Sequence, residues 1–344
     1  MGLVRMFREE CSAKFMAFSF GEKDEVRRDN SIEEHVLRSN GPFARNQMLD
    51  KLIEFNPRVI IVFDRELADI AKAYIKARNG KANVIVLTDS PDVVYNFAMR
   101  IDHMRIPGLL KELIRSVYLW RQRRVYKRTI NAATHVILPT EEDRARLIAL
   151  MPYAKSKSYV MQLIPLGNVK KTRPVKKVRK VLFVGACNYP PNNEAVHIIE
   201  EKIAPALPNK IFYVLGLGCT ARSHDNFSCL GEVSEEELYK TLEDADLCIA
   251  PLLHGTGFKS KVLEYLRYGK PVIGTHVAFQ GFAVRDRFSA LIEDNPEQFA
   301  RRIKELDDDP ALIAKIQKNI PTVLQEFSEE KLRKKFAKFC KSLV

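Results

Sequence analysis

The sequence predicts an α/β protein with two domains, each built on a mostly parallel sheet. Short β-branched apolar runs alternate with longer amphipathic segments along the whole chain, which is typical of buried parallel strands joined by helices. The 344 residues suit two domains of ordinary size better than one core. Hydrophobic residues make up 46% and charged residues 29%, so a disordered chain and a fibrous repeat are both excluded.

The first half of the chain, residues 1–168, is assigned to an N-terminal domain. Apolar runs predict strands at residues 14–20, 57–63, 83–87 and 135–138. Helical spacing of apolar residues predicts helices near residues 46–55, 66–78, 108–131 and 141–150. Thr140 precedes Glu141 and Glu142, so we expect it to be the N-cap of the last of these helices.

The segment 169–180 is predicted to be an interdomain linker, because it is rich in charge, contains Pro174 and has no amphipathic period. A second α/β unit follows at 181–327. Its strands are predicted at 181–185, 211–216, 246–250 and 271–275, and its helices near 193–203, 234–243, 259–268 and 297–306. Such an alternation with short connections is typical of a doubly wound, Rossmann-like domain.

The last segment, 328–344, has an apolar face at helical spacing, formed by Leu332, Phe336, Phe339, Cys340 and Leu343. We therefore predict a C-terminal helix that packs back on the N-terminal domain.

The net charge of +13 is unevenly distributed. Residues 1–180 carry 35 Lys and Arg against 20 Asp and Glu, whereas residues 181–344 carry 21 against 23. An imbalance of this kind indicates that the first half faces something anionic, such as a membrane surface, a phosphorylated acceptor or nucleic acid.

No stretch approaches the length of a membrane span, and charges interrupt the apolar start of the chain, unlike a secretory signal. The six cysteines, at positions 11, 187, 219, 229, 248 and 340, show no metal-binding spacing, and we expect them to be reduced core thiols. The expected location is the cytoplasm, with the inner face of the membrane as a site of peripheral association.

The most informative stretch is residues 251–274, PLLHGTGFKSKVLEYLRYGKPVIG, which has a strand, a glycine turn and a helix. Gly255 and Gly257 allow close approach of the backbone, and the helix that follows begins with unpaired N–H groups. Lys259 and Lys261 stand at the start of that helix, where a cation is disfavoured unless an anion is bound there too. The pattern therefore predicts a bound diphosphate, with Glu264 placed to accept hydrogen bonds from the two ribose hydroxyls. Solvated lysines on an ordinary helix are the alternative.

The whole string resembles the donor-site motif of the family 4 glycosyltransferases, of the type GxGxKxKxLExLxxGKPV, in the second domain of a GT-B fold. Residues 181–196, VLFVGACNYPPNNEAV, are similar to the strand, glycine loop and YxPN turn that open this domain in one branch of the family. The resemblance covers residues 181–344 well and residues 55–165 more loosely. It implies two Rossmann-like domains with a cleft between them and the acceptor on the first domain.

The resemblance also implies roles for individual residues. Lys259 and Lys261 would neutralise the leaving diphosphate of a nucleotide sugar, and Glu264 would hold the ribose. The full donor-binding set is Gly185, Asn188, Gly216, His254, Gly255, Thr256, Gly257, Phe258, Lys259, Lys261, Val262, Leu263 and Glu264. Catalytic roles are expected for Asp89 and Lys261. No cofactor and no metal are expected, because basic side chains and helix N–H groups stabilise the leaving group.

Three features depart from the family pattern. Many members have a glutamate eight residues before the ribose glutamate, where this chain has Thr256. An arginine and a lysine that bind the diphosphate elsewhere are replaced here by Asn188 and residues 190–193. The first strand and glycine loop of the N-terminal domain are not evident, so residues 1–11 would be the remnant of the first helix and residues 14–20 the second strand.

Asp89 follows the strand at 83–87, at the end of a strand where α/β sheets place functional groups, although a turn aspartate that caps Ser90 explains it equally well. The segment 111–130 has seven basic residues, one acid and three interleaved aromatic residues. It suits an interfacial membrane helix, a nucleic-acid contact or a solvated helix face. Its candidate contact residues for a membrane or a polyanion are Arg121, Arg123, Arg124, Lys127 and Arg128.

The leading hypothesis is a retaining, metal-independent glycosyltransferase that moves a sugar from a nucleotide diphosphate to an unidentified acceptor, such as a glycan or a lipid-linked sugar. The alternative is a degenerate protein of the same fold that serves as a scaffold or binds nucleic acid, with a steep salt dependence. An epimerase on the same fold is a third reading, but its carboxylate and histidine set is not evident.

Overall fold

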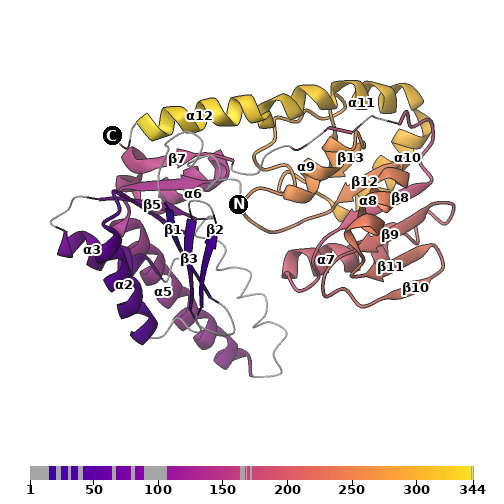
Figure 1. Cartoon of the computed structure of the whole chain (residues 1–344). Coiled ribbons are helices and arrows are strands. Elements are labelled where there is room, and N and C mark those ends of the chain that lie inside the picture. The colour runs from indigo at the N-terminus through magenta and orange to yellow at the C-terminus, as the bar shows by residue number, and fades with distance from the viewer. Residues whose placement is uncertain are drawn as a thin grey trace. The chain divides into compact units, whose positions relative to one another are not determined.

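The computed structural model describes residues 15–20, 25–29, 32–37, 42–63, 67–78, 82–88, 107–162, 167, 169–170, 173–341 and 343. The chain divides into two compact units, each of which can be followed by colour and label in Figure 1. Unit 1 comprises Met1–Pro91, Ser116–Leu163 and Arg333–Val344, and unit 2 comprises Asp92–Arg115 and Ile164–Leu332.

The main sheet of unit 1 is parallel, with the strand order β4-β5-β6-β7. Its strands are β4 (Val59–Val62), β5 (Asn83–Leu87), β6 (His135–Leu138) and β7 (Ser158–Val160). Val84, Ile85 and Val86 are all buried, so both faces of β5 are covered, which is why its sequence is an unbroken apolar run. The structure confirms the predicted strands at β4, β5 and β6, whereas the three-residue β7 was not predicted.

The helices of this part of the chain are α2 (Pro42–Phe55), α3 (Ala68–Ala77), α5 (Gly108–Ala132), α6 (Glu141–Leu150) and the 3₁₀ turn η3 (Pro152–Lys157). Helix α2 packs on α3, in a small cluster of its own, and residues 108–115 of α5 are assigned to unit 2. Tyr126 and Ile130 of α5 and Leu147 of α6 belong to one buried cluster with Val84 of β5. The prediction for the start of α6 is confirmed, because the Thr140 hydroxyl accepts a hydrogen bond from the Asp143 N–H at 3.1 Å.

A second, three-stranded sheet in unit 1 has the order β1-β3-β2. Its strands are β1 (Phe15–Phe20), β2 (Glu25–Asp29) and β3 (Ile32–Leu37). The prediction of a strand at residues 14–20 is confirmed, but its expected place as the second strand of the main sheet is wrong, because β1 pairs with β3. Strands β2 and β3 were not predicted, because they are rich in charged residues and contain no apolar run.

The sheet of unit 2 has seven strands in the order β10-β11-β9-β8-β12-β13-β14. They are β8 (Lys180–Val184), β9 (Ile211–Leu215), β10 (Arg222–His224), β11 (Phe227–Gly231), β12 (Leu247–Ala250), β13 (Val272–Gly274) and β14 (Leu291–Ile292). All neighbouring pairs are parallel except β10 with β11. The four predicted strands are β8, β9, β12 and β13, which form the centre of the sheet.

Helices surround this sheet, and several begin at a side-chain cap. They are α7 (Pro190–Ile198), its π-helical continuation η4 (Ile199–Ile203), α8 (Glu235–Asp244), α9 (Ser260–Arg267), η5 (Pro296–Gln298), α10 (Phe299–Asp308), α11 (Pro310–Leu324) and η6 (Gln325–Phe327). Ser234 accepts a hydrogen bond from the Glu237 N–H, and Asp309 accepts one from the Leu312 N–H. Helix α11 was not predicted, since Pro310 and Pro321 interrupt its pattern.

Helix α12 (Glu329–Lys341) returns the chain to unit 1. Phe336 and Phe339 are buried in a cluster with Ile85 of β5 and Ile137 of β6. The Asn83 side-chain amide donates a hydrogen bond to the Leu343 carbonyl at 2.8 Å. The apolar face predicted from the sequence is therefore the face of α12 that packs on the main sheet of unit 1.

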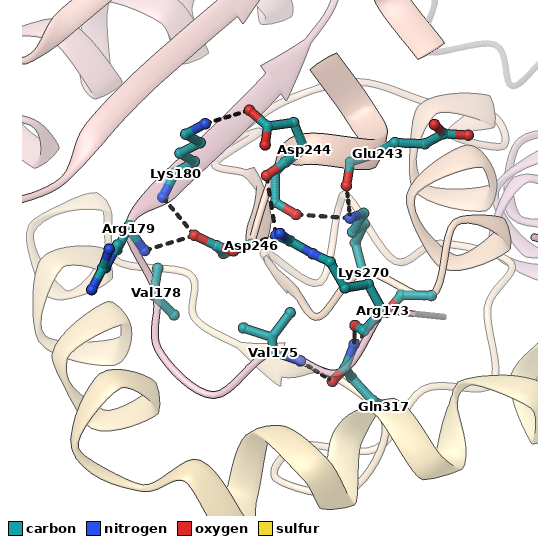
Figure 2. Close-up of polar contacts among 12 residues, drawn as sticks. Arg173, Val175, Val178, Arg179, Lys180, Glu243, Asp244, Asp246, Lys270 and Gln317 are labelled. Atoms are coloured by element: carbon teal, nitrogen blue, oxygen red, sulfur yellow. Dashed lines mark hydrogen bonds and ion pairs between the residues drawn. The ribbon is translucent and has the colours of Figure 1, made fainter. Parts of the chain in front are cut away.

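The segment interpreted as a linker is bonded to unit 2 over residues 173–180, at the amino ends of β8 and β12 (Figure 2). Asp246 accepts hydrogen bonds from the N–H groups of Arg179 and Lys180, at 2.9 and 3.0 Å, and pairs with the Arg173 guanidinium at 2.7 Å. Lys270, which is only 3% exposed, donates to the carbonyls of Glu243 and Ala245. These bonds fix one end of the sheet, opposite to the end that carries the site described below.

Two expectations about the whole chain are answered by the described residues. Cys187 and Cys219 form a disulfide, so the prediction that all six cysteines are reduced thiols is wrong for this pair. The two cysteines are 32 residues apart in sequence and lie on the loops after β8 and β9, which are neighbouring strands in the sheet. Within the described ranges, no helix combines the length and the apolarity that crossing a membrane requires.

Candidate functional site

The candidate site lies at the carboxyl edge of the unit 2 sheet, where the neighbouring strands β9, β8 and β12 end. Each of these strands is followed by a loop that contains a predicted site residue: Gly216 after β9, Gly185 after β8 and the segment 251–259 after β12. Because the carboxyl ends of parallel strands meet at one edge, these loops lie next to one another, in the position where open α/β sheets bind ligands.

The first two loops touch through their glycines. A Cβ placed on Gly216 would lie 2.1 Å from the Gly185 carbonyl oxygen, a distance that no side chain tolerates. A Cβ on Gly185 would lie 2.7 Å from Lys261 Nζ and 2.9 Å from the side-chain amide carbon of Asn192. Gly216 is therefore required by close packing against backbone, whereas a side chain at Gly185 would displace the side chains of Lys261 and Asn192. Gly185 thus lies directly beside the predicted cation Lys261. Gly216 therefore has a structural explanation independent of its predicted role in donor binding.

Lys261 is the central cation of the site. Its ammonium group donates a hydrogen bond to the Asn192 side-chain oxygen and lies 4.4 Å from the centre of the Phe183 ring. Burial and, to a smaller extent, the neighbouring positive charge of Lys259 together lower the pKa of Lys261 to about 7. The positive charge of this ammonium group is therefore only partly stabilised by its surroundings. A bound anion would raise the pKa of Lys261 again and keep the group protonated.

Helix α9 holds Lys261 in place because the next turn of the helix is anchored in the core. Tyr265, one turn beyond Lys261, is buried, and its hydroxyl accepts a hydrogen bond from the Val184 N–H at 2.7 Å. This bond ties α9 to the end of β8. The position of Lys261 relative to Gly185 is therefore set by rigid elements on both sides.

The glycine loop before α9 is shaped around Lys259. Gly255 and Gly257 have φ angles of 124° and 74°, in the region that favours glycine. The Lys259 ammonium group donates to the carbonyls of Gly257 and Thr256, at 2.7 and 3.1 Å, and the residue is 8% exposed. Lys259 is the N-cap residue of α9, one position before the first turn in which it was expected.

Phe258 anchors the same loop, with its ring stacked on Phe282 at a centroid distance of 4.4 Å and tilted against Phe327. The loop thus rests on an aromatic cluster instead of on solvent, which fixes the path of residues 254–259. A loop fixed in this way needs little reorganisation when a ligand binds.

Glu264 lies on α9, one turn beyond Ser260, and is partly exposed. Its carboxylate pairs with the Arg267 guanidinium at 2.9 Å. Burial raises the pKa of Glu264, and the positive charge of Arg267 opposes that shift. The ribose-binding role remains a prediction, and it requires that the hydroxyls of the ligand share this carboxylate with Arg267.

A further pair lies beside the glycine loop. His254 Nε2 is 3.8 Å from a carboxylate oxygen of Glu194 on α7, and a Cβ on Gly255 would meet the Tyr189 hydroxyl at 3.4 Å. Glu194 and Tyr189 were not in the predicted set. Tyr189 belongs to the YxPN turn and Glu194 follows that turn on α7, and their approach to the loop follows from the pairing of β8 with β12.

The remaining predicted residues divide into three groups. Val262 and Leu263 are buried in the core, and their N–H groups donate to the Lys259 carbonyl, so neither side chain faces the loops. Asn188 lies beside Gly218, within 3.5 Å of where its Cβ would be. Asp89 lies outside the described residues, and its catalytic role remains a prediction.

Asn192, like Tyr189 and Glu194, is a site residue that sequence reasoning missed. It is 7% exposed, accepts from Lys261 and donates to the Ala186 carbonyl at 2.9 Å, which binds the YxPN turn to the loop after β8. The available signal was the PPNN string itself, in which two prolines at the start of a helix are followed by a short amide side chain.

Residues 178–309 match the family described as Glycosyl transferases group 1. Among solved structures, HepE of Anabaena in complex with UDP-glucose is 12% identical, with a TM-score of 0.69 over 96% of this chain and 100% of HepE. A glycosyltransferase from Rickettsia africae is 14% identical, with a TM-score of 0.66 over 99% of this chain and 94% of that one.

TarM is 13% identical, with a TM-score of 0.63 over 84% of this chain. The present chain spans 56% of the length of TarM. The search among curated proteins found no matching relative. At these identities, the solved structures show a shared fold, and the family match covers the part of unit 2 that contains all three loops.

Proposed function

We propose that this chain, which has the GT-B fold and carries a glycosyl transferases group 1 domain at residues 178–309, binds the diphosphate of a nucleotide sugar at the loops after β8, β9 and β12. The chain is a glycosyltransferase. The observation that supports the donor site most strongly is the convergence of Lys261, Gly185 and Asn192 next to the amino end of α9. An anion at this point would meet a cation, helix N–H groups and no opposing carboxylate among the contacts that define it.

The proposed reaction retains the anomeric configuration of the sugar. An acceptor hydroxyl oxygen forms a bond to the anomeric carbon, and the bond from that carbon to the diphosphate oxygen breaks. The electron pair stays on the departing phosphate oxygen, which takes the acceptor proton. Lys261 and Lys259 stabilise the charge that develops on this oxygen, so the transfer proceeds without a metal ion.

UDP-sugars are the first donors to examine, because HepE of Anabaena was solved with UDP-glucose and with UDP. The sugar is proposed to be recognised without the usual glutamate, since Thr256 occupies that position. His254 stands two residues before Thr256 in the chain, and His254 and Glu194, which are 3.8 Å apart, offer an imidazole and a carboxylate instead.

A calorimetric titration with UDP, GDP and ADP, and with their sugar conjugates, tests the donor site. One nucleotide should bind, and Lys261→Met should weaken that binding about tenfold or more, because a charge-assisted hydrogen bond contributes roughly 1.5–3 kcal/mol. Glu264→Gln should weaken nucleotides but not inorganic diphosphate, which lacks the ribose. Lys318→Met, an exposed lysine on α11, serves as the matched loss of charge.

The result that would remove the phosphate role is an unchanged nucleotide affinity in Lys261→Met. If no nucleotide bound at all, the result would favour the alternative hypothesis, a degenerate protein of the same fold that serves as a scaffold or binds nucleic acid. Retention is tested separately, by following the slow hydrolysis of the bound donor by NMR. Release of the inverted anomer would overturn the proposed stereochemistry while leaving the binding site intact.

A further inference from the structure

Helix α5 has one face that is anchored in unit 1 and one that is not. On the anchored face, Tyr126, Thr129 and Ile130 are buried against the main sheet. On the opposite face, the helix leaves large apolar side chains in solvent along its first half. Leu109 is 91% exposed, Leu113 60%, Val117 56% and Trp120 59%, and Leu110 is also exposed.

These side chains form a stripe instead of being scattered. With roughly 100° of rotation per residue, Leu109, Leu113 and Trp120 fall within about 40° of one another around the helix axis, and Val117 is about 40° further. A contiguous apolar stripe of this kind on a soluble protein indicates a surface that another body covers.

The second half of the helix has exposed cations that continue the apolar stripe or flank it. Arg121, Arg123, Arg124, Lys127 and Arg128 are all exposed. Arg124 lies over the Trp120 ring at 4.6 Å, at the point where the apolar stripe meets the cationic half. The helix contains one acid, Glu112, and this residue is paired with Arg115 at 2.6 Å.

We propose that this face of α5 docks on an anionic lipid bilayer, with the leucines, Val117 and Trp120 inserted at the acyl boundary and the five cations among the headgroups. The inference does not depend on the proposed function of unit 2. Exposed aliphatic side chains gain nothing from a nucleic acid, whereas they gain transfer free energy on entering lipid. A second copy of the chain would bring five cations against five, so self-association through this face is disfavoured.

The chain provides its own probe, because Trp120 is its single tryptophan. Titration with vesicles of phosphatidylcholine and phosphatidylglycerol should shift the Trp120 emission to shorter wavelength, and lipids brominated along the acyl chain should quench it. Vesicles of phosphatidylcholine alone should have a much smaller effect, and added salt should weaken binding to the anionic vesicles. An emission that stays unchanged with anionic vesicles, or that brominated lipid does not quench, would overturn the proposal.

Two variants separate the apolar and cationic contributions, with sedimentation of vesicles as the readout. Arg121→Gln with Arg123→Gln and Lys127→Gln leaves the Arg124–Trp120 contact in place and should weaken binding about 100-fold. Leu113→Gln with Val117→Gln keeps every charge and should still weaken binding about tenfold or more. Lys240→Gln with Lys304→Gln and Lys318→Gln removes three exposed lysines of other helices and should bind as the wild type does.

Anisotropy titrations with single-stranded and duplex oligonucleotides provide the competing outcome. Oligonucleotide binding with no vesicle binding, or vesicle binding that the Leu113→Gln and Val117→Gln variant retains in full, would show a polyanion site and contradict the insertion of α5. If the control variant and the variant of Arg121, Arg123 and Lys127 lost vesicle binding equally, binding would depend on net charge alone. That result would also contradict the insertion of α5. Circular dichroism and nucleotide affinity confirm that each variant is folded.

Discussion

Lys261 has a lowered pKa and lies in the proposed donor site, so the affinity for nucleotide should depend on pH. In the free protein, burial and Lys259 lower the pKa of Lys261 to about 7, so the ammonium group loses its proton as the pH rises through neutrality. A bound diphosphate raises that pKa again. Binding above pH 7 therefore takes up a proton, and nucleotide affinity should fall by up to about tenfold per pH unit.

The measurement is a calorimetric titration between pH 7 and 9, a range in which the terminal phosphate of the nucleotide is already ionised. Repeating it in buffers of different ionisation enthalpy reports the proton uptake directly. Lys261→Met should bind weakly at every pH, without the decline. Equal declines in the variant and the wild type would assign the titration to another group.

Individual residues also show which parts of the candidate site could be predicted from the sequence. Gly255, Gly257 and Lys261 were identified because a glycine turn before a helix has a distinctive local pattern, and Gly185 was identified from the resemblance of residues 181–196 to a known family. Asn192 was missed because its partner Lys261 is 69 residues away in the chain, and nothing local marks the contact. The Cys187–Cys219 disulfide was missed for the same reason, since only the pairing of β8 with β9 brings the two loops together.

Among the elements, the short connection between α8 and β12 is expected to matter for stability, because it contains the largely buried Asp246 side chain. Asp246 accepts from two backbone N–H groups and from Arg173 (Figure 2). Asp246→Ala leaves both N–H groups without their acceptor and should lower the free energy of unfolding by about 2–4 kcal/mol. Asp246→Asn keeps one oxygen for them, and Arg173→Ala removes only a half-exposed ion pair, so each should cost about 1 kcal/mol or less.

Urea denaturation of the three variants measures these differences. Equal losses in Asp246→Ala and Arg173→Ala would mean that the ion pair, and not the backbone acceptor, carries the stabilisation.

The same distinction between local and distant determinants explains which elements were predictable. Strands β5, β8 and β12 are buried on both faces and β9 is largely buried, and the apolar composition of all four is visible in any short window. Strands β2, β3, β10 and β11 are polar or only partly apolar and exist because a neighbour pairs with them. Helix α11 escaped notice because Pro310 at its first position reads as a break, although proline is well suited to that position.

At the scale of the whole molecule, the last helix of the chain completes the hydrophobic core of unit 1. Phe336, which is fully buried, packs with Ile85 and Ile137, residues that lie about 200 positions or more earlier in the sequence. The core of unit 2 is a separate cluster. Phe336→Ala should therefore destabilise unit 1 by about 3–5 kcal/mol while leaving unit 2 nearly unchanged.

Pulsed thiol labelling in urea, read by mass spectrometry, distinguishes the units. Cys340 reports on unit 1, and the buried Cys248 reports on unit 2. In Phe336→Ala, labelling of Cys340 should move to lower urea while labelling of Cys248 keeps its midpoint. Lys335→Ala changes the exposed neighbour on the same helix and should move neither. If both cysteines shifted together in Phe336→Ala, the two cores would be unfolding as one cooperative unit, and the last helix would be stabilising the entire chain.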